Sequence, residues 1–276
     1  MIINSDSIFS FLASAIKRKT LPNIVNPSSL TDKVLKIKMS PDHPKANLRA
    51  LVSDRKAVRE YIDSKSTECK LIPLLWSGSR FSLEDYENLP NKFVIKANHG
   101  SKMVRIVDKS DARDNYESVS AEVNSWQFVD YYKKGKEWVY KSIERTLIVE
   151  KFIDFKDGVP PDYKFFCLNG KVSFIQVDLD RFNGHCRNLY NREFLRLPVC
   201  YQFPSGYDIE KPILFDQALR IAEKLSSDFD FIRVDLYILD DGIYFGELTN
   251  FPGNCLESFN PKSFDFEIGR MLTLEE

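Results

Sequence analysis

The stretch "RVDLYILDDGIYFGELTNFPG", residues 233–253, predicts two β-strands joined by a tight turn. Apolar residues fill most of both strands, yet Asp235 lies in the first strand and Glu247 in the second. Burying a carboxylate in a strand is costly unless a cation or a hydrogen-bond donor accompanies it. The partners of these two carboxylates are therefore the question on which both fold and function depend.

Two registers of this hairpin give different answers. If the loop is residues 241–242, Asp235 and Glu247 point to opposite faces of the hairpin. If the loop is residues 240–242, the two carboxylates lie directly opposite each other on one face. A three-residue loop favours glycine in its last, left-handed position, where Gly242 lies, so we predict the second register.

The predicted register separates charged from apolar side chains. Arg233 then lies opposite Thr249, and Leu239 opposite Ile243. The other face carries an apolar packing surface made of Val234, Leu236, Ile238, Tyr244 and Leu248. Adjacent carboxylates repel unless a cation lies between them, and Mg²⁺ takes one or two carboxylates together with phosphate and water oxygens. The hairpin therefore predicts a magnesium site; the alternative is a surface pair in which Asp235 is bridged to Arg233 or to a lysine.

The overall composition limits the class of protein. The chain has 276 residues, enough for one large or two modest domains, and its 39 basic and 40 acidic residues leave a formal charge of -1. This balance argues against a general nucleic-acid surface. The 5 cysteines are odd in number and include no CxxC pair, so we expect a reduced, cytoplasmic protein.

The segment "IFSFLASAI", residues 8–16, is the only one that resembles a targeting signal. It is too short to span a bilayer, and its basic cluster follows the apolar run, whereas a secretory signal carries its charge before that run. We expect a short helix docked on the body of the protein, with contact to a membrane surface as the alternative.

The order of the predicted elements is that of an α+β fold rather than a regular βαβ repeat. We predict strands at residues 92–97, 104–108 and 146–153, a hairpin turning at Asn169-Gly170, one helical turn within 82–90, and helices over 31–65, 112–144 and 215–229.

The stretch "KFVIKANHGSKMVRIV", residues 92–107, places Lys96 at the end of a strand and Gly100 in the loop that follows. A loop between two strands can fold over phosphates, with its backbone N–H groups and the lysine supplying positive potential. One glycine is not a glycine-rich loop, and a lysine at a strand end is often simply solvated. No GxxxxGK[ST] motif occurs, so this is not a P-loop.

Taken together, these segments resemble the ATP-grasp superfamily, and most closely its TupA-like branch, which is associated with bacterial cell-surface polysaccharides and teichuronopeptide. The likeness spans roughly residues 31–265 and is carried by "DRKAVREYI", "LIPLLW", "NKFVIKANHGS", "GKEWVYKSI", "IVEKFI", "PDYKFFCLNGKVSFIQVDLDRF", "HCRNLY", "FIRVDLY" and "YFGELTNFPG". It implies two α+β subdomains gripping ATP between them, preceded by a mostly helical segment. The expected boundaries are 1–91 for the helical segment, 92–149 for the small subdomain with its phosphate flap, and 150–276 for the large subdomain with the metal hairpin.

The resemblance also implies roles for particular residues. ATP is expected to contact Lys96, His99, Gly100, Ser101, Glu150, Lys151, Phe152, Asp162 and Lys164, with Glu150 and Lys151 at the adenine and Asp162 at the ribose hydroxyls. Mg²⁺ is expected at Asp235, Glu247 and Thr249. The residues expected to act on phosphate or acyl phosphate are Lys96, Arg181, Arg187 and Arg233.

Three positions depart from the pattern of the family. Lys102-Met103 fill places that usually hold glycine, Arg55 stands where a phosphate-binding lysine is usual, and Thr249 replaces an asparagine. Lys102 at the loop tip either stiffens the flap or reaches a phosphate itself.

The resemblance implies an ADP-forming ligase that uses ATP and Mg²⁺ to join a carboxylate to an amine through an acyl phosphate. The expected acceptor is a uronate of a bacterial surface polysaccharide or its nucleotide-linked precursor, in a cytoplasmic protein with no nucleic-acid partner, no stable membrane insertion and a possible homodimer. Two alternatives stay open: an ATP-grasp kinase, and an inactive nucleotide-binding partner of a glycan-assembly complex.

Overall fold

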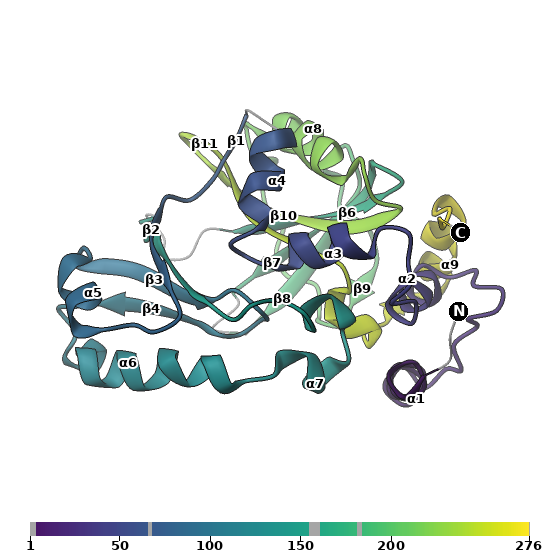
Figure 1. The fold of residues 1–276 in the computed structure, drawn as a ribbon. Coiled ribbons are helices and arrows are strands. Elements are labelled where there is room, and N and C mark those ends of the chain that lie inside the picture. The colour runs from purple at the N-terminus through teal and green to yellow at the C-terminus, as the bar shows by residue number, and fades with distance from the viewer. Residues whose placement is uncertain (1–3, 66–67, 155–160, 181–183, 276) are drawn as a thin grey trace. The chain divides into compact units, whose positions relative to one another are not determined.

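The computed structural model describes residues 4–65, 68–154, 161–180 and 184–275 (Figure 1). The chain divides into two compact units. Unit 1 comprises Met1–Ala46, Ile62–Lys70 and Pro160–Glu276, and unit 2 comprises Asn47–Tyr61 and Leu71–Val159. Both units mix helices and antiparallel strands, so the predicted α+β class is confirmed.

Unit 1 contains a six-stranded sheet with the strand order β1-β11-β10-β6-β7-β8. Its strands are β1 (Cys69–Lys70), β6 (Asp162–Leu168), β7 (Lys171–Leu179), β8 (Cys186–Tyr190), β10 (Phe231–Leu239) and β11 (Gly242–Thr249). Only the short β1 pairs in parallel within this described sheet; every other neighbouring pair is antiparallel. The predicted turn at Asn169-Gly170 is confirmed, because Leu168 pairs with Lys171 and both turn residues have positive φ, 47° and 76°.

One face of this sheet is covered by α8 (Phe215–Ser226), which packs against β10, β6 and β7. The ring of Phe165 stacks on that of Phe215 at 6.1 Å, and Phe165 shares its face with Val234 and Ile175, its partners on β10 and β7. The remaining elements of unit 1 are α1 (Ser5–Arg18), α2 (Leu30–Lys38), α8 (Phe215–Ser226), α9 (Ser263–Met271), the 3₁₀ turn Pro252–Cys255 and a small sheet of β9 (Cys200–Tyr201) and β12 (Phe259–Asn260). Residues 162, 164, 235 and 247 therefore point away from α8.

Unit 2 contains a four-stranded antiparallel sheet with the order β2-β5-β3-β4. Its elements are β2 (Leu74–Gly78), β3 (Lys92–Ala97), β4 (Val104–Asp108), β5 (Leu147–Lys151), α3 (Ala46–Ser53), α5 (Leu83–Asn88), α6 (Tyr116–Ser125), α7 (Tyr131–Gly135) and the 3₁₀ turns Ala112–Asp114, Trp126–Phe128 and Trp138–Tyr140. The division between the units falls within α4 (Val58–Lys65). The helix expected over 112–144 is thus broken into short pieces.

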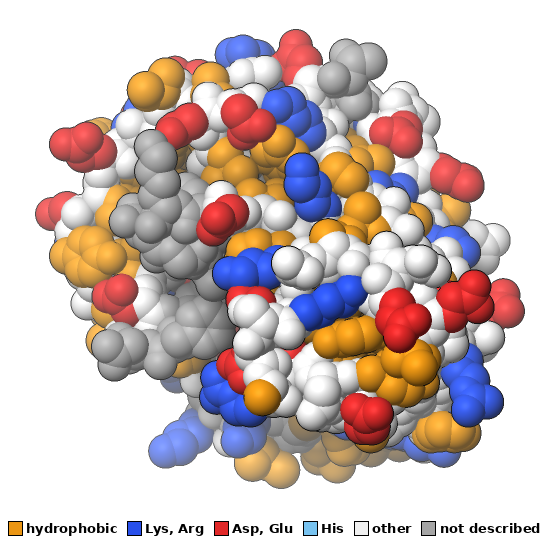
Figure 2. All heavy atoms as spheres, turned by 90° about the vertical axis from the view of Figure 1, so that its left-hand side faces the viewer, with side chains coloured by type: hydrophobic (Ala, Val, Ile, Leu, Met, Phe, Trp, Pro, Cys, Tyr) orange, Lys and Arg blue, Asp and Glu red, His pale blue; other side chains and the backbone are white. Residues whose placement is uncertain are grey.

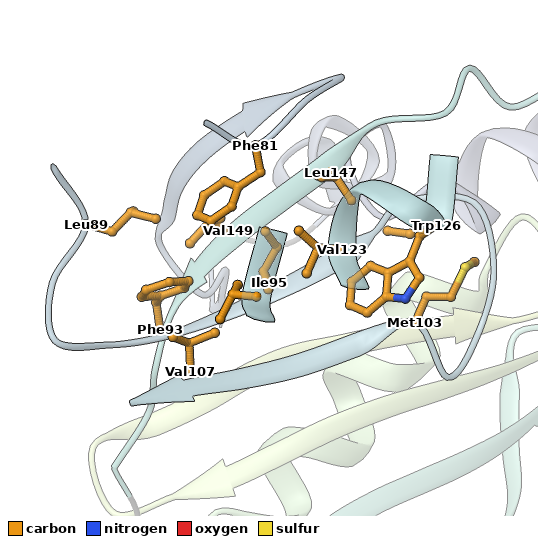
Figure 3. Close-up of a cluster of buried hydrophobic side chains, with 12 residues drawn as sticks. Phe81, Leu89, Phe93, Ile95, Met103, Val107, Val123, Trp126, Leu147 and Val149 are labelled. Atoms are coloured by element: carbon orange, nitrogen blue, oxygen red, sulfur yellow. The ribbon is translucent and has the colours of Figure 1, made fainter. Parts of the chain in front are cut away.

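The core of unit 2 follows the period-2 pattern of its strands. Phe93, Ile95 and Ala97 are fully buried on one face of β3, where side chains of β5 and α6 meet them (Figure 3). Lys96 therefore lies on the opposite face of the sheet, together with Val94.

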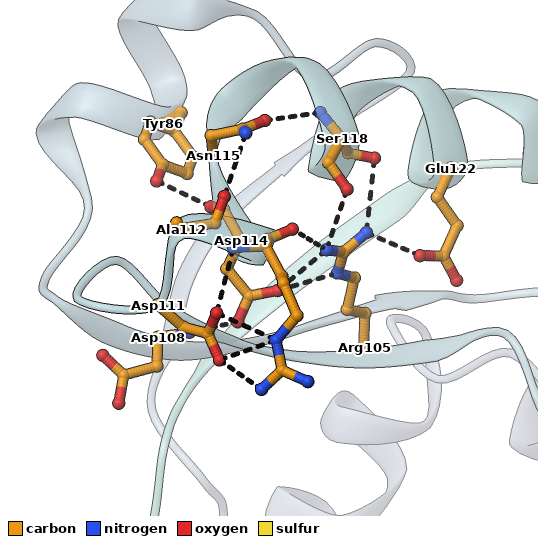
Figure 4. Close-up of polar contacts among 10 residues, drawn as sticks. Tyr86, Arg105, Asp108, Asp111, Ala112, Asp114, Asn115, Ser118 and Glu122 are labelled. Atoms are coloured by element: carbon orange, nitrogen blue, oxygen red, sulfur yellow. Dashed lines mark hydrogen bonds and ion pairs between the residues drawn. The ribbon is translucent and has the colours of Figure 1, made fainter.

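Arg105 fastens the segment between β4 and α6 (Figure 4). Its guanidinium pairs with Asp114 at 2.8 Å and with Glu122 at 2.7 Å, and it also donates to the backbone carbonyl oxygens of Arg113 and Ser118. This side chain links β4 to the 3₁₀ turn Ala112–Asp114 and to α6, so we assign it a structural role.

The surface agrees with the balanced composition. On the face shown in Figure 2, basic and acidic side chains are interspersed. Among the described residues, no helix is both long and apolar enough to cross a membrane. The predicted boundaries at residues 91/92 and 149/150 stay predictions, although the second falls inside β5, which pairs with both β2 and β3.

Candidate functional site

The hairpin places Asp235 directly opposite Glu247, as predicted, but it does so by a different route. The strands close at Leu239 and Gly242, so the expected pairing of Leu239 with Ile243 and the expected three-residue loop are wrong. A β-bulge follows Asp235, and Gly246 is the extra residue. The bulge shifts the register by one residue and so restores the pairing of the two carboxylates.

Gly246 is the residue type that this bulge requires. A Cβ atom at this position would lie 2.9 Å from the backbone oxygen of Asp235, closer than carbon and oxygen normally approach. The bulge also exchanges two aromatic residues between the faces of β11: Phe245, opposite Leu236, is buried, while Tyr244, opposite Tyr237, lies on the face of Asp235. Tyr244 is therefore a correction to the predicted apolar surface.

The partners of the two carboxylates are cationic side chains of the same face. Arg233 donates from Nε and Nη2 to both oxygens of Asp235, each at 2.7 Å, and from Nη2 to Glu247 Oε1 at 3.1 Å. Thr249 accepts from Arg233 at 3.0 Å and donates to Glu247 at 2.9 Å. Both predicted metal carboxylates thus converge on one guanidinium nitrogen, while the Asp235 side chain is 3% exposed and that of Glu247 is 42% exposed.

Lys164, opposite Asp235 on β6, supplies the second cation. Its ammonium nitrogen lies 3.1 Å from Asp235 and also contacts Asp162, and all three side chains are buried. Burial acts to lower the pKa of Lys164, but Asp162 and Asp235 outweigh burial and raise it. Burial raises the pKa of Asp235 to about 6, against the opposing effect of Arg233 and Lys164. In the ligand-free chain Asp235 is thus bridged to both Arg233 and Lys164, as the alternative to a metal site predicted. The pairing lies at a buried position rather than at the predicted surface position.

The polar face continues across β7 and β8, where sequence reasoning missed Asp178. Asp178 on β7 lies opposite Asp162 on β6 in the sheet. Asp178 accepts a hydrogen bond from Arg187 Nε at 2.6 Å, and Arg187 also lies 3.3 Å from Glu257. Burial acts to raise the pKa of Asp178, but Arg187, Lys164 and His185 outweigh burial and lower it to about 2. The alternation of Gln176 and Asp178 in "FIQVDL" was the signal that marked these residues.

These contacts define a polar row on the face away from α8. In the part of the chain that the structure describes, the row consists of Asp162, Lys164, Gln176, Asp178, Arg187, Arg233, Asp235, Glu247, Thr249 and Glu257. Among these residues five carboxylates accompany three lysine and arginine side chains, so the row as described is acidic.

The donor set of the row fits Mg²⁺. Two carboxylates that already surround a cationic nitrogen, beside the Thr249 hydroxyl, present the hard oxygen ligands that this ion prefers. No group of three or more His, Cys, Asp or Glu side chains with metal-binding geometry occurs among the described residues. A site of two carboxylates completed by phosphate and water oxygens is what Mg²⁺ usually takes.

Unit 2 holds the predicted phosphate lysine. Lys96 donates to Glu150 at 2.6 Å, and Arg59 donates to the other oxygen of Glu150 at 3.2 Å. Glu150 is buried and lies on β5 opposite Val94. Since two strands and an ion pair fix its position, the Lys96 ammonium is held at the end of β3 rather than left mobile in solvent.

The loop after Lys96 is anchored at its base. Asn98 accepts from the Thr146 backbone N–H at 2.8 Å, and His99 contacts the carbonyl oxygen of Val129 through Nε2 at 3.2 Å. Both side chains are buried, and burial lowers the pKa of His99. His99 therefore orders the loop from inside unit 2.

Two positions at the tip of the loop favour glycine for physical reasons. A Cβ at Gly100 would lie 2.4 Å from the ring of Tyr131, whose hydroxyl group hydrogen-bonds to Ser101. Lys102 is exposed and has φ 64°, in the left-handed region that glycine adopts without strain. Arg55, where the resemblance implied a lysine, donates to the carbonyl oxygen of Ala97 at 2.6 Å and so supports the base of the loop.

The remaining predicted residues have simple positions. Lys151 ends β5 and is exposed, and Phe152 follows it half-buried. Arg181 lies outside the described residues.

Comparisons with known proteins identify the family. No curated protein matches this sequence. Among solved structures, the chain is similar to an L-amino acid ligase from Bacillus licheniformis, with 14% identity over 98% of this chain and 57% of that one and a TM-score of 0.49. It is also similar to D-alanine–D-alanine ligases from Helicobacter pylori (17% identity, 85% and 62% covered, TM-score 0.48) and from Bacillus anthracis, complexed with ATP (14% identity, 72% and 54% covered, TM-score 0.44). The chain spans between half and two thirds of the length of each of these proteins. The sequence matches the TupA-like ATP-grasp family over residues 33–273, and the chain therefore belongs to that family.

Proposed function

We propose that this protein is an ATP-dependent carboxylate–amine ligase. The observation that carries the proposal is the convergence of Asp235 and Glu247 on the Arg233 guanidinium, in a polar row inside the region matched by the ATP-grasp family. A cluster that balances buried charge in this way is suited to bind a divalent ion together with phosphate groups.

The residues divide into metal ligands and phosphate contacts. Asp235, Glu247 and Thr249 would hold Mg²⁺, which when bound supplies charge neutralisation at the phosphate oxygens. Arg233 and Lys164 pair with Asp235 in the ligand-free chain. If a metal ion took the Asp235 oxygens, donors of both side chains would become available to bind phosphate.

Lys96 would act on the transferring phosphoryl group. Its ammonium is already positioned by Glu150, so little reorganisation accompanies its use. On the same face of the unit 2 sheet, Val104 and Ile106 are 41% and 47% exposed. Such an apolar surface beside a lysine suits a flat base attached to phosphates.

The proposed reaction has two steps. In the first, a substrate carboxylate oxygen attacks the γ-phosphorus of ATP, and the bond to the β,γ-bridging oxygen breaks, giving acyl phosphate and ADP. In the second, an amine attacks the acyl carbon, phosphate leaves and the amine loses a proton, giving an amide. Catalysis of this kind depends mainly on positioning and electrostatic stabilisation.

We propose a uronate of a bacterial surface polysaccharide, or its nucleotide-linked precursor, as the carboxylate substrate. This choice is supported by the resemblance to the TupA-like branch, which is associated with bacterial cell-surface polysaccharides. Arg187 in the row is a candidate contact for the acyl phosphate, although in the ligand-free chain Asp178 and Glu257 already bind it.

The test measures ADP and phosphate release together, with a panel of uronates and amines and with Mg²⁺ present. Equal amounts of ADP and phosphate, dependent on both substrates, are expected. ADP without free phosphate would indicate a kinase, and nucleotide binding without turnover on any substrate would indicate an inactive partner.

Two matched pairs of variants assign the residues. Asp235→Asn should abolish Mg²⁺-dependent turnover, whereas Asp216→Asn, at a side chain 69% exposed, should not. Lys96→Ala should lower turnover by orders of magnitude while ATP binding weakens modestly, because the cation acts where charge develops in the transition state. Lys92→Ala, on the same face of β3 and 55% exposed, is its control. Near-normal activity in Asp235→Asn would remove that residue from the metal site.

A further inference from the structure

The first helix, α1, buries a polar face and exposes apolar side chains, the reverse of an ordinary surface helix. Its buried residues are Ser7, Ser10 and Ser14, which recur at the spacing of one helical face. Four of its large apolar side chains point outward instead: Ile8 is 51% exposed, Phe9 42%, Leu12 52% and Ile16 73%, whereas Phe11 is half-buried. A surface helix normally buries its apolar face and exposes its polar one, so this orientation needs a cause.

Polar contacts fix the orientation. Ser14 donates to the carbonyl oxygen of Cys255 at 3.1 Å, and Ser7 donates to that of Met39 at 3.2 Å. Arg18, with its side chain 7% exposed, pairs with Asp32 at 2.8 Å and lies 3.7 Å from Asp265. All of these partners belong to unit 1, so the serine face is a built interface that holds the apolar face toward solvent.

The apolar face ends in a basic region. Lys17 and Lys19 are exposed, whereas Arg18 between them is turned inward. A cavity of about 260 Å³ lies beside this end of the helix, and Leu21, Phe266 and Lys262 are among the residues that line it. Leu21 is 75% exposed and Phe266 45% exposed, so the apolar surface continues past the helix among lysines.

We infer that α1 docks on an anionic lipid surface, with Ile8, Phe9, Leu12 and Ile16 entering the interface between headgroups and acyl chains. A helix that carries bulky apolar side chains on one face, with lysines at its border, lies in the plane of such an interface. Lys17, Lys19 and Lys262 supply the charge complementarity, because lysines near a negatively charged bilayer add to binding. This attachment lies along the surface and crosses no bilayer.

A second copy of the chain fits the same face less well. Four apolar side chains fall far short of the roughly 20–30 residues a side found in stable protein interfaces. Because α1 precedes residues 33–273, the region matched by the family, the inference is independent of the proposed ligase activity.

The experiment is co-sedimentation of the full chain with vesicles of neutral phosphatidylcholine and with vesicles that also contain phosphatidylglycerol. Binding to the anionic vesicles is expected, weakening as salt is raised. The variant Leu12→Ser/Ile16→Ser should lower the partition coefficient at least about tenfold, since each lost CH₂ contributes to insertion. Lys17→Gln/Lys19→Gln should weaken binding by a similar factor on anionic vesicles only.

Controls separate lipid binding from other causes. Ile213→Ser, at a fully exposed apolar side chain outside α1, should leave binding unchanged. Thermal unfolding of the α1 variants should match that of the native chain, because the replaced side chains point into solvent. Absence of binding to anionic vesicles, or binding that survives Leu12→Ser/Ile16→Ser, would overturn the inference. So would a lipid-free dimer, seen by sedimentation velocity, that the same variant dissociates.

Discussion

Replacing Lys164 by methionine tests whether the charge interactions within the polar row contribute to the free energy of unfolding. The Lys164 side chain is 7% exposed, and its ammonium contacts Asp162 and Asp235, whose side chains are 8% and 3% exposed. Methionine keeps much of the volume and removes the charge. Breaking a buried ion pair from one side typically costs about 3–5 kcal/mol. Since Arg233 continues to bind Asp235, we expect a loss near the lower end, about 3 kcal/mol in the free energy of unfolding.

The loss should depend on pH in a definite direction. Burial already raises the pKa of Asp235 to about 6, above its ordinary value, and removing Lys164 raises it further. Between the pKa of Asp235 in the native chain and its higher pKa in the variant, Asp235 is protonated in the folded variant but ionised in the folded native chain. Lowering the pH through this range therefore stabilises the folded variant relative to the native chain. The stability difference should therefore shrink by up to about 1.4 kcal/mol per pH unit as the pH falls through this window.

The assay is urea unfolding followed by far-UV circular dichroism at pH 8.5, 7.5 and 6.5. All three tryptophans, Trp76, Trp126 and Trp138, lie in unit 2, so their fluorescence serves as a separate reading of the unit that is not altered. The matched control is Lys171→Met, whose side chain is 76% exposed and pairs with Glu223 at 3.4 Å. An exposed pair of this kind is worth less than about 1 kcal/mol. If the two variants lose the same stability, with no pH dependence in either, the row is not coupled and the reasoning fails.

Three further predictions follow from single residues. Gly246→Ala should lower the free energy of unfolding by about 1–3 kcal/mol, because its Cβ would overlap the backbone of Asp235. It should also reduce Mg²⁺-dependent turnover. Unchanged urea unfolding would contradict the role of the bulge. Lys102→Gly should stabilise unit 2 by about 0.5–1 kcal/mol in tryptophan-detected unfolding, because glycine adopts the left-handed φ of 64° without strain. Weaker ATP binding in this variant would show that Lys102 reaches a phosphate. The pKa of Asp178 is lowered to about 2, so Asp178 contributes about 2 kcal/mol to the free energy of unfolding above pH 4, and this contribution is lost as the pH falls from 4 to 2. Unfolding measured across that range should show this pH dependence in the native chain and not in Asp178→Asn. An identical pH profile in the variant would refute the pairing with Arg187.

The sequence by itself determined the elements whose signals are local. Positive-φ turn residues at Asn169-Gly170 and the alternation in 92–97 predict a hairpin and a strand, and both are present. Period-2 alternation also determined that Lys96 and the core residues Phe93 and Ile95 lie on opposite faces. The pairing of Asp235 with Glu247 was predicted from a three-residue loop that the hairpin does not have, so this prediction is correct only because a bulge compensates for the shorter loop.

Only the tertiary structure decided the features that depend on distant partners. The loop of the hairpin and the bulge at Gly246 depend on how closely the backbone of Asp235 approaches, which no local propensity records. Asp178 joins the row because β7 and β6 pair, and Glu257 because a later turn brings it to Arg187. The outward face of α1 was hidden for the same reason. Its apolar periodicity predicts burial, and the opposite orientation results from serine and arginine contacts to Met39, Cys255, Asp32 and Asp265, residues remote in sequence.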